Sequence, residues 1–232
     1  MKREEVLRRL QAQAAGEEFR RFSESLAPSS HPLIGVRTPA LRALGKEIAK
    51  GDWREYLSSA EEDTYEELLL QGFVIGYAHV PVEERLELIS GFVPKIDGWA
   101  VCDCACSTFT AARKYPKQFW DFILPYLDDD NPWAVRFGII MLMDYFIDDT
   151  HIDRTLKLLG NVWSDFYYVQ MGAGWALSVC FAKYRDKTLA LLRSDTVMQP
   201  IRRKAIQKCI ESFRVSEEDK LLLKTLRANL KG

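Results

Sequence analysis

The chain has 232 residues, of which 47% are hydrophobic, 28% charged and 12% aromatic. A chain of this length and composition can bury enough apolar surface to fold as one globular domain, or two small ones, without disulfides or metals. The aromatic content excludes a disordered polyelectrolyte. The 32 basic and 33 acidic residues give a net charge of -1, which excludes a uniformly basic nucleic-acid coat protein.

No segment has the pattern of a membrane span or a signal peptide. Uncharged stretches such as 137–143 are far shorter than the roughly 20 apolar residues that a membrane-spanning helix needs. The first residues, Met-Lys-Arg-Glu-Glu, lack the apolar core of a signal peptide. The odd number of cysteines, 5, fits reduced thiols in a cytosolic protein. We therefore expect a cytoplasmic protein with no membrane partner.

The near-zero net charge hides an uneven distribution along the chain. Residues 1–60 carry a net charge of +3, residues 61–130 carry -9, and residues 131–232 carry +5. The last fifty residues alone carry 13 basic and 6 acidic side chains. Such asymmetry can steer a polyanion to one part of a neutral protein, although solvation of terminal helices explains the charge pattern equally well.

Helical periodicity runs through nearly the whole chain, and hairpin signals are absent. Thr38-Pro39 supplies an N-cap and a proline in the first turn, and Gly51 ends the same helix. Further along, Gly160, Asp165, Asp195 and Ser216 separate the remaining segments. This punctuation predicts helices at 40–49, from 63 or 64 to 78, and at 81–93, 116–126 and 131–146.

Alternate helices are predicted to start near 64, 98, 132, 166 and 199, a spacing of about 34 residues that is typical of stacked helix pairs. A short internal repeat agrees with this period, because Trp-Ala-Val at 99–101 recurs at 133–135. We therefore predict an all-α fold, a right-handed α-solenoid of HEAT-like repeats that forms a single domain over 1–232. An irregular all-α bundle is the alternative. In a solenoid, these alternate helices line one surface.

The residues that most often carry metal or nucleotide chemistry are poorly arranged for it. Cys102, Cys104 and Cys106 alternate, and residues two apart on a helix point about 200° apart, so their thiols cannot converge on one ion. They are better interpreted as small thiols in helix packing. The histidines are isolated, and no phosphate-binding glycine motif is present. We expect no metal and no cofactor.

Aromatic, acidic and basic residues occupy repeat-related positions. Trp99 and Asp103 are spaced i and i+4, so they share one helix face. Aligning the repeats places Arg136 next to the position of Asp103 on the neighbouring helix, and Trp175 lies on the helix after that. The following helix carries Arg202, Arg203 and Lys204. Such a set can stabilise a transient cation while it holds phosphates. Alternatively, the tryptophans belong to the repeat core and Asp103 caps or pairs locally.

Three segments of the sequence, 97–103 (DGWAVCD), 131–136 (NPWAVR) and 169–175 (VQMGAGW), resemble the three pocket segments of the AlkD-like DNA alkylation repair family. Their spacing also matches, and 34–39 (IGVRTP) is similar to the entry into that family's third helix. The resemblance covers nearly the whole chain.

The resemblance implies a HEAT-like repeat DNA glycosylase that hydrolyses the N-glycosidic bond of 3- and 7-alkylpurines in double-stranded DNA. It implies that Trp99 and Trp175 pack against the deoxyribose of the lesion, that Asp103 is the catalytic carboxylate, and that Arg136 grips the DNA backbone. From the charge pattern we add Arg202, Arg203 and Lys204 as phosphate contacts. We expect a monomer that associates with the nucleoid when bound to DNA.

Two departures from the family pattern bear on activity. The segment before Gly35 is short and 27–32 reads as a loop, which predicts that the N-terminal helix pair is reduced. The acidic run at 128–130 repels phosphates if it faces the DNA. A non-catalytic HEAT-like module that binds DNA or a protein through the same face is the alternative function. A protein-interaction scaffold with both tryptophans in its core is a third.

Overall fold

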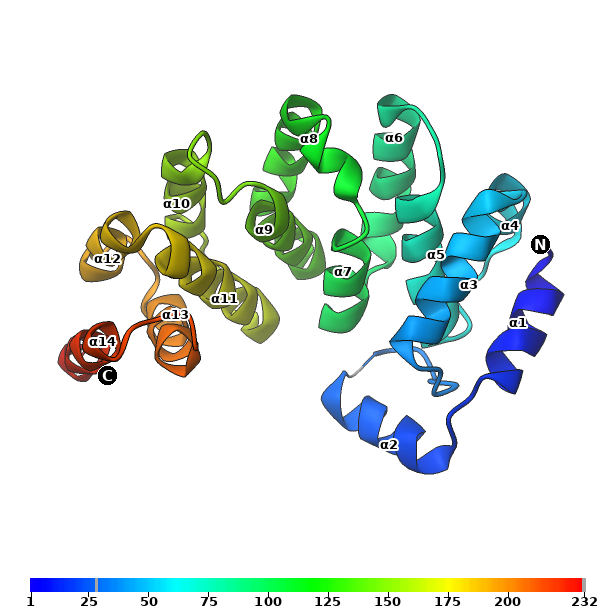
Figure 1. The fold of residues 1–232 in the computed structure, drawn as a ribbon, viewed down its shortest axis with the longest axis horizontal. Helices are drawn as coiled ribbons and strands as arrows, with labels where there is room; N and C mark the ends of the chain where they lie inside the picture. The colour runs from blue at the N-terminus through cyan, green and yellow to red at the C-terminus, as the bar shows by residue number, and fades with distance from the viewer. Residues whose placement is uncertain (28, 231–232) are drawn as a thin grey trace. The chain divides into compact units, whose positions relative to one another are not determined.

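The computed structural model describes residues 1–27 and 29–230 and is built from helices (Figure 1). Within these residues no strand is formed, and the one extended pairing is an isolated antiparallel bridge between Ala14 and Val36. The predicted all-α class is confirmed. The chain divides into two compact units, Met1–Phe122 and Ile123–Gly232. No helix of the described part is long and apolar enough to cross a membrane.

In the first unit, α3, α5 and α7 lie side by side, and α4 and α6 each pack against one of them. The Arg42 side chain connects α3 to both of the other helices. It donates hydrogen bonds to Tyr77 Oη on α5 at 3.1 Å and to Ser107 Oγ, directly after α7, at 2.9 Å. The elements of this unit are α1 (Arg3–Ala12), α2 (Glu17–Leu26), α3 (Thr38–Lys50), α4 (Trp53–Ser59), α5 (Tyr65–Tyr77), α6 (Val82–Phe92), η1 (Val93–Lys95), α7 (Trp99–Cys106), η2 (Thr110–Arg113) and α8 (Pro116–Ile123), which ends at the boundary.

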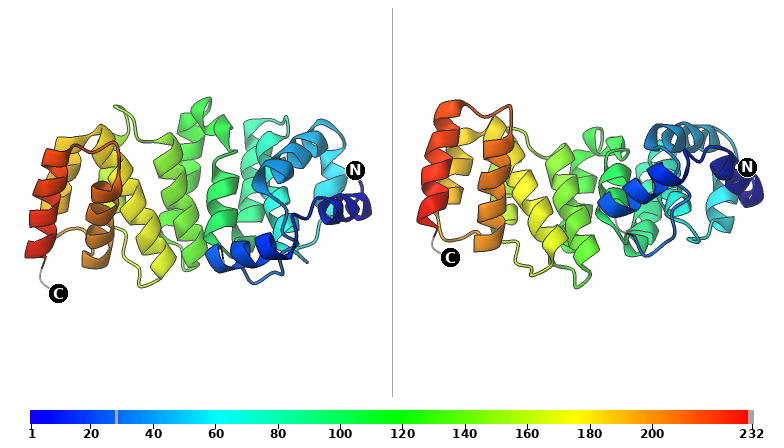
Figure 2. Two further views of the ribbon diagram at one scale, coloured as in Figure 1. Left: turned by 60° about the horizontal axis from the view of Figure 1, so that its bottom comes forward. Right: turned by 90° about the horizontal axis from the view of Figure 1, so that it is seen from below.

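In the second unit, α9, α11 and α13 are neighbours, α10 and α12 pack together behind α11, and α14 packs on α13. Figure 2 shows these helices in yellow-green to red. The elements are η3 (Leu124–Asp128), α9 (Pro132–Tyr145), α10 (Ile152–Gly160), α11 (Tyr167–Lys183), α12 (Arg185–Arg193), α13 (Gln199–Glu211) and α14 (Glu217–Asn229).

Most helix starts follow the punctuation in the sequence, but Thr38 is the first residue of α3 rather than its N-cap, which is Arg37 and makes no side-chain capping bond. Thr64 Oγ1 accepts a hydrogen bond from the backbone N–H of Glu67, and Asn131 Oδ1 accepts one from Trp133, so both residues act as N-caps. The helices predicted to start near 64, 98, 132, 166 and 199 begin at Tyr65, Trp99, Pro132, Tyr167 and Gln199, which confirms the period of about 34 residues.

Before the predicted loop at 27–32, residues 3–26 form two helices of 10 residues each, α1 and α2, which the sequence did not place. Helix α1 is anchored by fully buried Val6 and Leu10. Its Arg3 side chain is also tied to α5 through a hydrogen bond of 2.8 Å to the buried carboxylate of Glu67. The described residues of 27–32 are irregular, as the sequence predicted. The helix pair that we expected to be reduced is therefore present.

Of the three alternating thiols, Cys102 and Cys106 are buried in helix packing, as predicted, and Cys180 and Cys209 are buried as well. Burial raises the pKa of Cys180 and of Cys209 to about 12, so both remain protonated thiols at neutral pH. Cys104 on α7 is the partly exposed member, and burial raises its pKa as well. These cysteines contribute to the apolar core.

The close approach of α11 and α13 depends on Gly174. A Cβ at this position would lie 2.8 Å from Lys204 Cβ and 3.0 Å from the backbone nitrogen of Ala205. We expect Gly174→Ala to lower the free energy of unfolding by about 1–3 kcal/mol, because the two helices must move apart. Urea denaturation measures the effect. The control is Gly91→Ala on α6, where an added Cβ meets nothing within 4 Å and a neutral or slightly stabilising effect is expected. Equal effects of the two changes would contradict this account.

Candidate functional site

Helix α7 presents Trp99 and Asp103 one turn apart on the same side of the helix, as their spacing predicted. Both side chains are half-buried. Gly98 enters the helix in an extended conformation, so the first helical residue is Trp99 itself. The indole Nε1 of Trp99 donates a hydrogen bond of 3.1 Å to the carbonyl oxygen of Leu26, at the end of α2. The ring is therefore fixed by a helix that the sequence did not predict.

A cavity of about 200 Å³ lies beside Trp99 in the first unit. Its apolar and aromatic walls include Phe19 and Leu26 from α2, Tyr65 from α5 and Trp99 from α7. The Cys104 side chain also lines it, next to Asp103 in the sequence. Trp99 and helix α2 therefore line the same cavity, and the indole is partly buried there.

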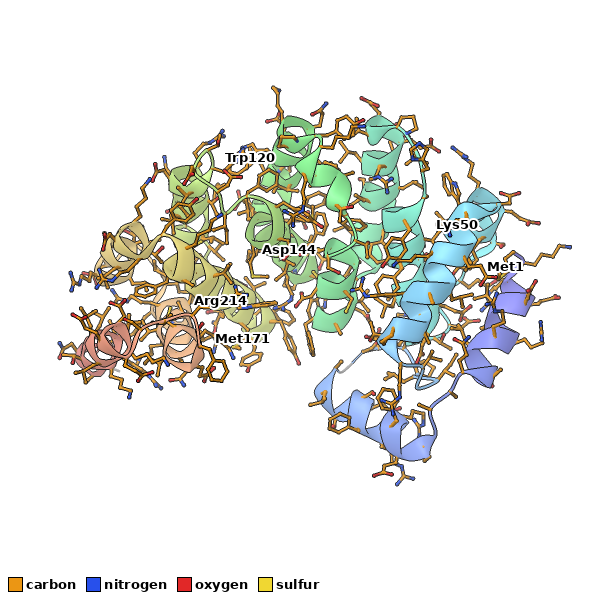
Figure 3. All side chains as sticks on the ribbon, in the orientation of Figure 1. Met1, Lys50, Trp120, Asp144, Met171 and Arg214 are labelled. Atoms are coloured by element: carbon orange, nitrogen blue, oxygen red, sulfur yellow. The ribbon has the colours of Figure 1, made fainter. Side chains whose placement is uncertain are left out.

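Helix α11 carries Trp175, which is 40% exposed, in the second unit. The residue lines a surface groove of about 410 Å³, together with Lys208 of α13 and Arg214 after it. A second groove of about 450 Å³ is lined by Met171, Lys204, Arg227 and others, and both grooves include Lys208. We call these two adjoining hollows the α11–α13 groove; Figure 3 labels Met171 and Arg214, which line its two parts. An exposed indole and several cations thus share one surface.

Arg136 is 4% exposed, and its side chain connects two helices within the second unit. Its Nη1 donates a hydrogen bond of 2.5 Å to the carbonyl oxygen of Tyr168 in the first turn of α11. Gly172 leaves room for the guanidinium, since a Cβ there would lie 3.2 Å from Nη1. Trp133, which aligns with Trp99, stacks on Tyr168 with the ring centroids 5.2 Å apart. In this state Arg136 joins α9 to α11.

The three basic residues predicted to contact phosphates differ in their surroundings. Arg202 is 8% exposed and donates to the Ser194 carbonyl at 2.5 Å and to Asp195 at 3.1 Å, so it closes the turn after α12. Arg203 donates to the Leu230 carbonyl at 2.5 Å, and both Arg203 and Lys204 line the α11–α13 groove. The Lys204 ammonium lies 4.8 Å from the ring centroid of Tyr167. Arg203 and Lys204 thus share a groove, whereas Arg202 is largely internal.

Sequence reasoning missed Lys208, Arg214 and Arg227, which line the α11–α13 groove. The signal for Lys208 was available, because it follows Lys204 by four residues on one helix face. Lys208 also pairs with Glu211 at 3.1 Å. Arg227 lies on α14, so only the packing of α14 on α13 reveals its place. The groove is basic overall.

The acidic run at 128–130 is exposed, at the start of α9. Asp129 accepts a hydrogen bond of 2.8 Å from the backbone N–H of Asn131, the N-cap of that helix. Carboxylates at this end stabilise a helix through its dipole. The run therefore has a local structural role. Within the described part of the chain, no three His, Cys, Asp or Glu side chains are placed to hold a metal ion.

The four predicted pocket residues are divided between the units: Trp99 and Asp103 lie in the first, Arg136 and Trp175 in the second. Their convergence on one sugar stays a prediction. Comparison with family models gives one further finding: residues 4–221 match the model described as DNA alkylation repair enzyme. A search of the curated proteins returned no match.

Proposed function

Because the chain belongs to the DNA alkylation repair enzyme family, we propose that it is a DNA glycosylase acting on cationic 3- and 7-alkylpurines in duplex DNA. The reaction is hydrolysis of the bond between the purine nitrogen and C1′ of the deoxyribose. The observation that carries the proposal is the pair formed by Trp99 and Asp103, an indole and a carboxylate on one side of α7. Both are partly exposed, so a substrate can reach them.

The chemistry suits a carboxylate next to an aromatic ring. An alkylated purine already carries a positive charge, so it leaves as a neutral base and needs little acid assistance. As the bond breaks, positive charge develops on the sugar as an oxocarbenium ion. The Asp103 carboxylate and the indole face stabilise that charge more than they stabilise the ground state, which lowers the barrier. Asp103 also orients or deprotonates the attacking water.

In this proposal, Trp175 packs on the deoxyribose from the second unit and Arg136 grips the DNA backbone near the lesion. Arg136 must exchange its bond to the Tyr168 carbonyl, or add to it, when DNA binds. The damaged base need not enter a snug pocket, so selectivity comes from the instability of the lesion itself. The reaction requires no cofactor and no metal, because the leaving group is activated by its own charge.

For the architecture we propose that the repeats form one domain, a right-handed α-solenoid of HEAT-like pairs. The packing of α3, α5 and α7 in one unit and of α9, α11 and α13 in the other supports this. We expect a monomer that works in the cytoplasm on nucleoid DNA. Small-angle scattering at several protein concentrations measures both the shape and the oligomeric state.

The test of the proposed function is a base-release assay. Duplex DNA methylated to contain 7-methylguanine and 3-methyladenine is incubated with the protein at low salt, with and without a metal chelator, and free bases are quantified. Release of methylated bases in both conditions supports the proposal. Retention of the DNA without release of bases supports the alternative, a HEAT-like module that binds DNA without catalysis.

The α11–α13 groove is expected to supply phosphate contacts, through Arg203, Lys204 and Lys208 in particular. Arg202 stays a proposed contact as well, although its burial makes it the weakest of the predicted set. Each cation that neutralises a phosphate releases about one counterion, so binding weakens with salt. Because Glu211 pairs with Lys208, a phosphate must displace that carboxylate. The expected affinity for undamaged duplex is therefore modest.

We expect Lys208→Gln to weaken duplex binding and to reduce the slope of log K against log salt by about 0.9. The matched control is Lys187→Gln on α12, which removes the same charge from an exposed lysine paired with Asp153. Fluorescence anisotropy with labelled duplex at several salt concentrations measures both slopes. If the two variants give the same slope, Lys208 makes no phosphate contact.

A further inference from the structure

The carboxylate of Asp97, two residues before Trp99, binds the segment that follows α2. Its Oδ2 accepts hydrogen bonds from Ser29 Oγ at 2.5 Å, from the Ser30 backbone N–H at 2.7 Å and from Ser30 Oγ at 2.8 Å. His31 Nδ1 lies 3.0 Å from the same oxygen. One carboxylate oxygen therefore contacts three consecutive residues. We call this set, Asp97 with 29–31, the Asp97 latch.

Helix α2 lacks the apolar anchoring that usually fixes a helix. None of its residues is buried, and Phe22 and Leu26 are 58% and 56% exposed. On either side of it lie Gly16 and Gly35, with φ of +97° and +90°, conformations that turn the chain sharply and that favour glycine. Contacts along α2, such as Phe19 against the Arg37 guanidinium at 4.3 Å, are supplemented by the Asp97 latch, which provides polar contacts just beyond its C-terminal end.

The latch acts on Trp99 through α2. The last carbonyl groups of a helix have no partner within it, and the carbonyl of Leu26 receives the indole N–H of Trp99. A tryptophan ring turns about two side-chain torsions, so one hydrogen bond to a fixed acceptor selects its orientation. Holding residues 29–31 in place restrains the end of α2 and with it this acceptor. The orientation of the ring is thereby linked to Asp97.

We propose that Asp97 is a positioning residue, which holds 29–31 so that Leu26 can fix the ring of Trp99 in the orientation that packs against the substrate sugar. This inference rests on the proposed function for the role of the ring, but its geometry does not. Asp97 touches no substrate in this scheme. It acts by removing the rotational freedom of Trp99 before DNA binds.

Electrostatics favour the charged form of the latch. Partial burial raises the pKa of Asp97, but the hydrogen bonds from Ser29, Ser30 and His31 outweigh burial and hold that pKa below its ordinary value. The carboxylate is therefore ionised at neutral pH. Its Oδ1 is buried without a hydrogen-bond partner, so Oδ2 accounts for the hydrogen bonding that keeps the group in place.

The experiment follows the indole N–H of Trp99 directly. The protein has 6 tryptophans, so a ¹⁵N-labelled sample gives 6 indole cross-peaks, and Trp99→Phe identifies the one of interest. In Asp97→Ala we expect this cross-peak to move and its exchange with solvent to quicken about fivefold to tenfold, while the other five stay in place. Asp97→Asn keeps one acceptor oxygen and should fall between Asp97→Ala and the wild type. The matched control is Asp121→Ala, which removes an exposed carboxylate from α8.

A second variant removes the hydrogen-bond donors of the Asp97 latch instead of its acceptor. Ser29→Ala/Ser30→Ala removes two hydroxyl donors without altering α7, and we expect the same change at Trp99 in the same direction. This variant decides the matter if Asp97→Ala does not fold. An unchanged Trp99 cross-peak, with unchanged exchange, in a folded Asp97→Ala protein and in the double variant overturns the proposal.

Base release is the second readout. In single-turnover assays we expect Asp97→Ala to slow release about tenfold or more, with the dissociation constant for duplex unchanged within about twofold. If the wild-type protein releases no methylated base, the proposed function is refuted. The effect of Asp97 on the Trp99 cross-peak is then the test of the Asp97 latch. A normal release rate in a variant whose Trp99 signal has moved refutes the link between ring orientation and catalysis.

Discussion

Replacing Asp103 by asparagine is expected to slow the release of methylated bases from duplex DNA by about 10²- to 10³-fold. Asparagine has nearly the same volume, so α7 and the neighbouring Trp99 stay in place, but the negative charge is lost. The half-buried position of Asp103 strengthens the effect, because a charge that is partly shielded from water interacts more strongly with an oxocarbenium ion. Single-turnover release of 7-methylguanine measures the loss.

The control for this variant is Asp121→Asn, which removes a carboxylate from the exposed face of α8, where it pairs with Lys117. Release by the control should match that of the wild type. Circular dichroism and duplex affinity should be the same in both variants. If Asp103→Asn retains release within about threefold, the carboxylate does not stabilise the transition state and the proposed mechanism fails.

The second large effect is expected on stability, at Glu66. This residue is 1% exposed, and its carboxylate accepts backbone N–H groups from Ile34 at 2.9 Å, Gly35 at 2.7 Å and Val36 at 3.0 Å. Glu66→Gln exchanges one acceptor oxygen for an amide donor that faces another donor. We expect a loss of about 2–4 kcal/mol in the free energy of unfolding, since hydrogen bonds to a charged group are replaced by an unsatisfied buried contact.

Urea denaturation monitored by tryptophan fluorescence measures this change. Glu87→Gln on the exposed side of α6 is the control, with an expected effect within about 0.5 kcal/mol. A loss at Glu66 no larger than at Glu87 would show that the three backbone groups find other partners. The Glu66 variant should also loosen the segment that leads from α2 into α3, because its carboxylate holds three consecutive residues there.

The sequence predicted the helices that begin with strong local signals. Thr64 and Asn131 are N-caps, and the prolines at 39, 132 and 200 lie in first turns, where their missing N–H costs nothing. The N-terminal helices were missed for two different reasons. Helix α1 carries Val6 and Leu10 four residues apart, a spacing that indicates an apolar helix face. Helix α2 buries no residue, so no requirement of core packing identifies it.

For the side chains of the candidate site, the sequence predicted local geometry but not burial. The spacing of Trp99 and Asp103 already placed them on one helix face, since that depends only on local geometry. The burial of Arg136 and Arg202 depends on which carbonyl groups lie nearby, and these belong to Tyr168 and Ser194. The sequence alone therefore does not distinguish an arginine that binds phosphate from one that hydrogen-bonds to a turn. The same limit hid Arg227, whose place depends on how α14 packs.

The two carboxylates that hold the segment after α2 have a consequence for how the chain matures. Glu66 and Asp97 lie some 30 and 70 residues downstream of the parts they secure, as the bonds from Ile34 and Ser29 show. During synthesis the N-terminal end emerges first, yet its anchor points are not made until α5 and then Asp97 have left the ribosome. Helices α1 and α2 must therefore both wait for later parts of the chain before they dock, since Arg3 of α1 also bonds to Glu67 on α5. Because Trp99 follows Asp97 in the chain, the hydrogen bond that ties its indole to Leu26 forms later still.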